Sequence, residues 1–173
     1  MLLEMLWAAG STFAFGILFN LKGKKLFFAG LGGALGWGVY IIFKNAEYSI
    51  PASFMFASMA LTIYSEIMAR ILKTPVTSTL IASLIPLVPG SGVYFTMSYF
   101  VENKLEEAAS KGIETLLITA AITVGIVFVS TFSQIYYKIR RYNRVKKMIK
   151  LRKEKKKKQI NKIAGNSVLH PKS

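Results

Sequence analysis

The 173-residue sequence contains no cysteine, and its single histidine, His170, lies close to the carboxyl end. The lack of cysteine excludes a disulfide framework and thiolate chemistry. No group of residues has the spacing of a metal site, and neither a nucleophile–base pair nor a phosphate-binding loop is visible. We therefore expect no metal, no cofactor and no enzymatic activity.

Positive charge is concentrated in the carboxyl-terminal tail. Residues 1–137 carry eight Lys and Arg against seven Glu, whereas residues 138–173 carry fifteen Lys and Arg against Glu154 alone. A basic tail can bind nucleic acid, but no recognised binding motif accompanies this one. Beside several apolar segments, the charge is more typical of a cytoplasmic anchor that obeys the positive-inside rule and contacts anionic lipid. We expect no nucleic-acid partner.

Long apolar blocks, without the alternation or narrow stripes of a soluble fold, make up most of the remaining chain. They predict an all-α polytopic membrane protein, with a transmembrane domain at residues 1–137 and a basic, helical cytoplasmic tail at residues 138–173. Each block has roughly the 17–25 residues that a membrane-spanning helix requires. The five predicted spans are about Leu2–Leu21, Leu26–Phe43, Ile50–Leu72, Val76–Phe100 and Ile113–Tyr137.

Lysines and arginines between the spans indicate the direction of the chain. The first connection holds Lys22, Lys24 and Lys25, the third holds Arg70 and Lys73, and the tail is strongly basic. Because such residues gather on the cytoplasmic side, these connections and the tail are predicted to be inside. An odd number of spans then places the amino terminus outside. We expect a multi-pass protein of the cell membrane with a cytoplasmic carboxyl terminus.

The fourth span is interrupted between Pro86 and Tyr94, where the sequence reads Pro-Leu-Val-Pro-Gly-Ser-Gly-Val-Tyr. Two prolines three residues apart and two glycines cannot continue an ordinary α-helix. Counted from Pro75, the break lies roughly 16–22 Å into the bilayer, near its midplane. Transporters use such broken helices to bind substrate or ion. The alternative is a proline kink whose unpaired backbone groups are satisfied by neighbouring helices.

The break has a direction that suits an anion. The first half-helix is predicted at Val76–Ile85, and the second begins between Pro89 and Ser91, with Ser91 as a candidate N-cap. The positive amino-terminal end of the second half-helix would attract a carboxylate from the cytoplasmic side. The predicted substrate-binding residues are Pro86, Pro89, Gly90, Ser91, Gly92, Tyr94 and Thr119.

Polar side chains recur at helical spacing in the third and fifth spans. Glu66 and Arg70 are four residues apart and close enough to pair. Charges in a span usually face the bundle interior or a cavity. These two are therefore either a structural pair at the membrane edge or a coupling and gating pair, in which Glu66 carries a proton or Arg70 meets an anionic substrate. Thr115, Thr119 and Thr123 share a face, and their hydroxyls either bond their own helix backbone or line a pore.

The second span contains the glycine-rich run Gly30–Gly38. It resembles a dinucleotide-binding fingerprint but fails by spacing, and it lies in a membrane segment. Small residues four apart let helix backbones approach closely where no hydrophobic effect drives association. Gly32, Gly33 and Gly36 are therefore predicted to be helix-packing positions.

Part of the chain resembles a known family. The combination of Glu66 and Arg70 with Pro-Leu-Val-Pro-Gly at residues 86–90 is similar to the threonine/serine exporter family. The resemblance covers about residues 1–137. Within the family, this sequence resembles in particular the small second component, which is similar to the carboxyl-terminal half of full-length exporters. Weaker similarities lie at Phe15–Asn20, Gly33–Trp37 and Gly112–Leu116.

The resemblance implies proton-driven export of small amino acids such as threonine and serine, or of the dicarboxylate succinate in some two-subunit relatives. It also implies a companion subunit that resembles the family's amino-terminal half. A chain that starts outside and ends inside could complete an inverted repeat with that half. A homo-oligomer is also compatible with the sequence.

These patterns predict a membrane subunit of a secondary exporter. A small carboxylate-bearing substrate would bind at the break, and Glu66 and Arg70 would be the coupling or gating pair. The alternative is a non-transporting membrane scaffold that uses its glycine-rich helix to bind a partner. The two functions differ in whether the polar break faces a water-accessible cavity.

Overall fold

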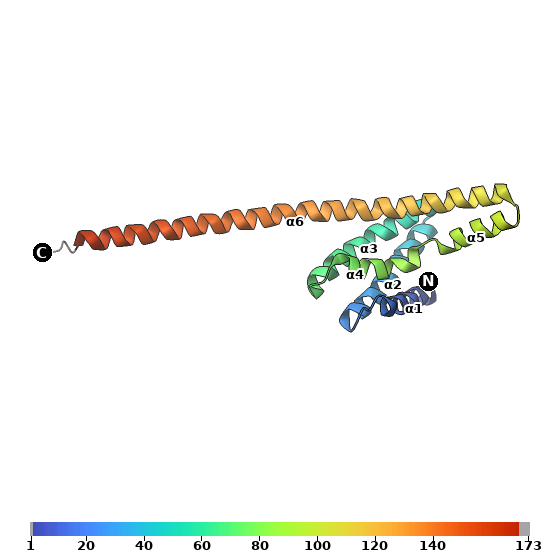
Figure 1. Cartoon of the computed structure of the whole chain (residues 1–173), viewed down its shortest axis with the longest axis horizontal. Coiled ribbons are helices and arrows are strands. Elements are labelled where there is room, and N and C mark those ends of the chain that lie inside the picture. The colour runs from blue at the N-terminus through green and yellow to red at the C-terminus, as the bar shows by residue number, and fades with distance from the viewer. Residues whose placement is uncertain (1, 170–173) are drawn as a thin grey trace. The chain divides into compact units, whose positions relative to one another are not determined.

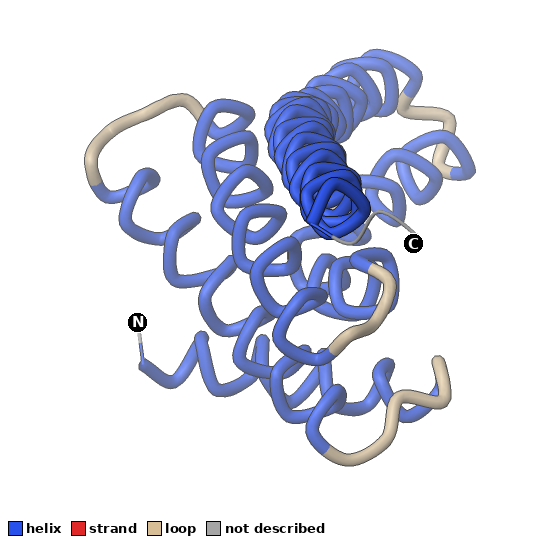
Figure 2. The backbone as a smooth tube through the Cα atoms, turned by 90° about the vertical axis from the view of Figure 1, so that its left-hand side faces the viewer, coloured by secondary structure: helices blue, strands red, loops and turns tan. Residues whose placement is uncertain are grey.

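A computed structural model describes residues 2–169 of the chain (Figure 1). All regular structure in this range is helical, which confirms the predicted all-α class. Short connections join the helices (Figure 2). The elements are α1 (Leu2–Leu18), α2 (Lys24–Asn45), α3 (Ile50–Leu72), α4 (Val76–Leu84), the 3₁₀ helix η1 (Ile85–Leu87), α5 (Gly90–Val101) and α6 (Leu105–Leu169).

The chain divides into two compact units, Met1–Thr131 and Phe132–Ser173. The first unit contains α1 to α5 and the first part of α6. In the second unit, the described residues are the remainder of α6, so the tail is helical as far as Leu169.

Helix α2 contacts α1, α3 and α4 in the first unit. The absence of side chains at its glycines permits this, because a Cβ added at these positions would meet a neighbouring helix. Each of the three predicted packing glycines faces such a contact: Gly32 lies against Ser83 and Tyr64, Gly33 against Thr12, and Gly36 against Leu87 and Leu61.

Two hydrogen bonds cross these close helix contacts. The Tyr64 hydroxyl of α3 donates to the Phe28 carbonyl of α2 at 2.8 Å, and the Ser83 hydroxyl of α4 donates to the Ala29 carbonyl at the same distance. Bonds of this kind between membrane helices contribute roughly 0.6–2 kcal/mol each. They fix α3 and α4 against the backbone of α2.

Three helical segments are long and apolar enough to span a membrane: α2, α3 and Leu105–Ile139 of α6. Residues 76–87 and α5 form a fourth candidate, bent by 50° at the break. Helix α1 has 17 residues, which cover about 25 Å, less than the roughly 30 Å hydrocarbon core. By length and composition the described chain has three or four spans, and the count of five stays a prediction.

The break itself consists of η1 followed by an inverse γ-turn. Pro89 has φ −76° and ψ 58°, and the Gly90 N–H donates to the Val88 carbonyl at 2.7 Å. This is the geometry of an inverse γ-turn, and the proline ring holds φ close to the required value. The predicted N-cap role of Ser91 is wrong, because Ser91 already lies in the first turn of α5 and no side chain caps that helix.

The break lies midway along its neighbours. Leu87 of η1 is fully buried against Gly36 and Leu61. Gly36 is the thirteenth of 22 residues in α2, and Leu61 is the twelfth of 23 in α3. The break therefore lies beside the middle of two candidate spans, and its depth in the bilayer stays a prediction.

Helices α5 and α6 are joined by a tight turn. The Lys104 N–H donates to the Tyr99 carbonyl at 2.9 Å, and Asn103 adopts a left-handed conformation with φ 57°. The Lys104 ammonium also contacts the Glu102 carboxylate at 2.7 Å, and this hydrogen bond lowers the pKa of Glu102. Helix α6 then begins at Leu105 and runs without interruption into the predicted fifth span.

Candidate functional site

A cavity of about 320 Å³ lies at the break in the first unit. Its walls come from α2, the start of α3, both sides of the break and the early turns of α6. The lining residues are Trp37, Tyr40, Ile50, Phe54, Pro86, Val88, Pro89, Ser91, Gly92, Lys111, Glu114, Thr115 and Ile118.

The amino-terminal end of α5 supplies unpaired backbone donors to this cavity. The γ-turn uses the Gly90 N–H, and the Val93 N–H donates to the Pro89 carbonyl at 3.2 Å. Within the described chain, the N–H groups of Ser91 and Gly92 have no backbone acceptor, and both residues line the cavity. Donors at a helix amino terminus favour an anionic guest.

A charged pair on α6 lines the same cavity. Lys111 Nζ lies 2.7 Å from Glu114 Oε2, and the two side chains are 34% and 40% exposed. The predicted span boundaries leave Lys111 just before the fifth span and Glu114 in its first turn, and neither residue is among the predicted site residues. Their opposite charges at i and i+3 beside an apolar span were the available signal.

Aromatic side chains form the α2 and α3 side of the cavity. The ring centroids of Trp37 and Tyr40 are 5.1 Å apart, and those of Tyr40 and Phe54 are 4.4 Å apart. The Trp37 Nε1 atom is buried at this wall, and the Glu4 side chain of α1 lies close enough to the indole to interact with it.

The threonines of α6 divide between the cavity and the exposed side of the helix. Thr115 is buried and lines the cavity, and its hydroxyl donates to the Lys111 carbonyl at 2.7 Å. Thr119 and Thr123 are exposed, and each hydroxyl donates to the carbonyl four residues earlier. All three hydroxyls therefore bond their own helix backbone.

The cavity brings together only some of the predicted substrate-binding residues. Pro86, Pro89, Ser91 and Gly92 line it. Tyr94 is 67% exposed on the outer side of α5, where its ring contacts Phe95. Tyr94, Gly90 and Thr119 are not part of the lining.

Glu66 and Arg70 lie elsewhere on α3. They form an ion pair, with Arg70 Nη2 at 2.6 Å from Glu66 Oε2, and Arg70 Nη1 also donates to the Glu66 carbonyl. Glu66 is 9% exposed. It follows Phe54 by twelve residues on the same helix, which is about 18 Å of helical rise. The pair is thus well separated from the break cavity.

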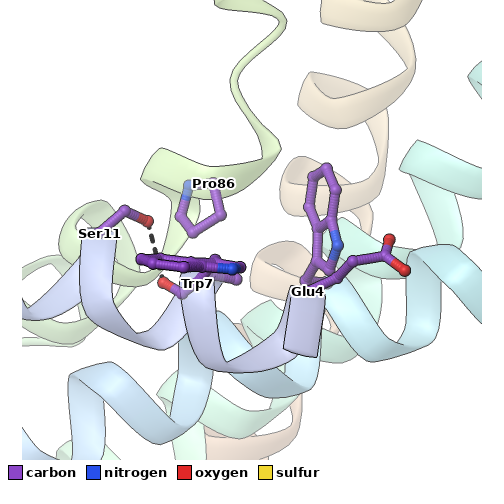
Figure 3. A pocket seen from close by; sticks show the side chains of 6 residues that line it. Glu4, Trp7, Ser11 and Pro86 are labelled. Atoms are coloured by element: carbon purple, nitrogen blue, oxygen red, sulfur yellow. Dashed lines mark hydrogen bonds between the residues drawn. The ribbon is translucent and has the colours of Figure 1, made fainter. Parts of the chain in front are cut away.

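A second, shallower groove of about 300 Å³ lies on the other side of the break. Helix α1 contributes Glu4, Trp7 and Ser11, and in the close view the Trp7 indole lies below Pro86 (Figure 3). The Ser11 hydroxyl donates to the Ala8 carbonyl at 3.0 Å. Because Trp37 and Pro86 line both spaces, they form a wall common to the groove and the cavity.

One family model covers most of the chain. Residues 4–132, about three quarters of the chain, match the family described as Threonine/Serine exporter, ThrE. No curated protein and no solved structure matches the chain. The matched range contains α1 from its third residue onward, α2 to α5 and the cavity-lining part of α6. The chain therefore belongs to the threonine/serine exporter family, and is a multi-pass membrane protein of a transport family.

Proposed function

We propose that this chain is a membrane subunit of a secondary exporter, and that it binds threonine, serine or a small carboxylate in the cavity at the break. The proposal rests on one observation: the amino-terminal end of α5 and the Lys111 side chain both line the same cavity. The N–H groups of Ser91 and Gly92 and the Lys111 ammonium are all donors. Charge-assisted hydrogen bonds to a carboxylate are roughly twice as strong as neutral ones.

The proposed topology has five spans, with α1 as the first and the amino terminus outside. Helix α1 packs along α2 through Gly33 and Thr12, so it would share the membrane with α2 despite its short length. The lysine-rich first connection and the basic tail would then be cytoplasmic. In this orientation α5 leads outward from the break, and its positive end faces a substrate that arrives from the cytoplasm.

Glu66 and Arg70 are proposed as the coupling or gating pair. Glu66 is the most buried carboxylate described and lies toward the predicted cytoplasmic end of α3. Ionisable residues inside membrane spans usually pair with one another, and in pumps and transporters such residues mark ion pathways and proton relays. Coupling would then act over a distance, because the pair and the cavity occupy different parts of α3.

A companion subunit is proposed as the partner. Large apolar side chains are exposed on α6, including Leu116, Val124 and Val127, each at least 57% exposed. Such a face needs lipid or another helix against it. The family resemblance favours a companion similar to the amino-terminal half of full-length exporters, placed against residues 1–137. The tail at residues 138–173 would serve as a basic anchor.

Single cysteine variants test whether the cavity binds substrate, because the natural chain has none. Ser91→Cys places a thiol at the cavity wall, and Thr119→Cys places one on α6 outside the lining. We expect a small polar thiol reagent to modify Ser91→Cys in membrane vesicles, and threonine or succinate to slow that reaction. Modification of Thr119→Cys should not respond to either compound.

The same experiment addresses the non-transporting scaffold. A scaffold predicts that Ser91→Cys is unreactive, or that its reaction is unaffected by every candidate substrate. Either result, in vesicles that contain the full chain and any subunit that copurifies with it, would contradict the exporter proposal.

A further inference from the structure

We propose that the Lys111–Glu114 pair recognises the charge pattern of the substrate, with Glu114 as the residue that favours an α-amino acid over a dicarboxylate. This inference rests on the proposed transport function and on the break cavity as its binding site. It assigns a specificity role to two residues that the sequence patterns did not single out.

The pair presents one positive and one negative group on the wall of a single cavity. Lys111 Nζ and Glu114 Oε2 are 2.7 Å apart on neighbouring turns of α6. An α-amino acid carries its ammonium and carboxylate on one carbon, so its two charges are similarly close. A zwitterion that enters the cavity can exchange partners with the pair: its carboxylate binds Lys111 and its ammonium binds Glu114.

The rest of the cavity supports both halves of this exchange. The Ser91 and Gly92 N–H groups, which have no backbone acceptor in the described part of the chain, add donors for the carboxylate. The indole and phenol rings of Trp37 and Tyr40 add aromatic faces, which attract an ammonium group.

The pair can open without a large cost. Its two side chains are 34% and 40% exposed in the described chain, and a partly exposed ion pair is weak where water reaches it. The flexible stems of lysine and glutamate also allow each charged group to turn toward a ligand. The pair therefore keeps the cavity neutral when it is empty and offers both charges when a zwitterion arrives.

A dicarboxylate cannot complete the exchange. One of its carboxylates can bind Lys111, but it brings no cation for Glu114. In a cavity of about 320 Å³, its second carboxylate comes close to the Glu114 carboxylate, and like charges at short range repel. Glu114 therefore acts against dicarboxylates, whereas Lys111 serves both classes of substrate.

The test compares half-saturating concentrations of threonine and succinate for export from proteoliposomes that contain the full chain with any copurifying subunit. Glu114→Gln should raise the half-saturating concentration of threonine about tenfold or more, which is the loss expected for one hydrogen bond to a charged group. It should lower the half-saturating concentration of succinate or leave it unchanged. Lys111→Gln should raise the half-saturating concentrations of both compounds.

Glu102→Gln is the matched control, because Glu102 pairs with Lys104 at the same 2.7 Å distance but lies outside the cavity. Glu102→Gln should leave the ratio of the half-saturating concentrations of threonine and succinate unchanged. If Glu114→Gln fails to assemble, Glu114→Asp, which withdraws the carboxylate by one methylene, should shift the ratio in the same direction by a smaller factor.

An unchanged ratio in the Glu114 variant that assembles, or an equal shift in Glu102→Gln, would overturn the inference while leaving the proposed function intact. If the wild-type protein shows saturable export of neither compound, the proposed function fails first, and the two failures are distinguishable.

Discussion

Gly92 in the first turn of α5 lies directly against the side chain of Thr115 on α6. A Cβ at Gly92 would lie 3.1 Å from Thr115 Cγ2 and closer still to the hydroxyl oxygen. The threonine cannot easily turn aside, because its hydroxyl donates to the Lys111 carbonyl at 2.7 Å. Since both residues line the cavity, this contact sets the separation of α5 and α6 at the proposed site.

Gly92→Ala is expected to push the two helices apart at the cavity. Overpacking of this kind typically costs about 1–3 kcal/mol, so thermal unfolding in detergent should occur at a lower temperature and export should fall several-fold. Gly90→Ala is the control, because nothing lies within 4 Å of a Cβ at that position. Adding Thr115→Ala to Gly92→Ala should restore part of the stability, since only the 3.2 Å contact with the threonine Cβ then remains. Equal behaviour of the two glycine variants would contradict this account.

A similar comparison tests the packing of α1 on α2. Gly33→Ala would bring a methyl group against the buried Thr12 side chain and 3.3 Å from the Ala8 carbonyl oxygen. The Thr12 hydroxyl is held by its own bond to that carbonyl at 2.9 Å. We expect Gly33→Ala to loosen α1, measured as faster proteolysis or faster thiol labelling at Ala8→Cys. Gly10→Ala, with nothing within 4 Å, should leave both rates unchanged.

The broken helix could be predicted from the sequence because its cause is local. Proline at positions 86 and 89 removes backbone donors and restricts the chain whatever surrounds it, and the structure ends α4 at Leu84 and begins α5 at Gly90 accordingly. The glycines of α2 are a similar case, since small residues at helical spacing have few roles in a span besides close packing.

The composition of the cavity could not be predicted, because it depends on which faces of distant helices meet. Residues four apart on an α-helix differ by about 40° in direction, so the row from Thr115 to Thr123 turns away from the cavity after its first member. Lys111 and Glu114 lie at the predicted start of the fifth span, where charged residues usually face the membrane surface, whereas α6 begins at Leu105 and carries both into the site.

Replacing both prolines of the break is expected to straighten the fourth span. Pro86→Ala with Pro89→Ala restores two N–H donors and removes the ring constraint, so the 50° bend should decrease and the cavity should be lost. Spin labels at Ile81 and Met97, both exposed, would report a longer distance in the double variant, and export should be abolished. Pro51→Ala is the control, since a proline in the first turn of a helix, as in α3, blocks no hydrogen bond. A normal substrate affinity in the double variant would show that the break does not form the site.

Glu66→Gln tests whether the buried carboxylate carries a coupling proton or only completes an ion pair. Arg70→Gln is the matched variant, because it removes the same 2.6 Å contact but keeps the carboxylate. If the carboxylate binds and releases the proton, Glu66→Gln should abolish gradient-driven export and flatten its pH dependence, while substrate exchange without a gradient continues. Arg70→Gln should then retain a pH dependence, because a titratable group remains at position 66. If the two residues only stabilise α3, both variants should lower the unfolding temperature and reduce exchange and driven export in parallel. Arg70→Gln should lower the unfolding temperature more, because it also removes the bond to the Glu66 carbonyl and leaves the more buried charge unpaired.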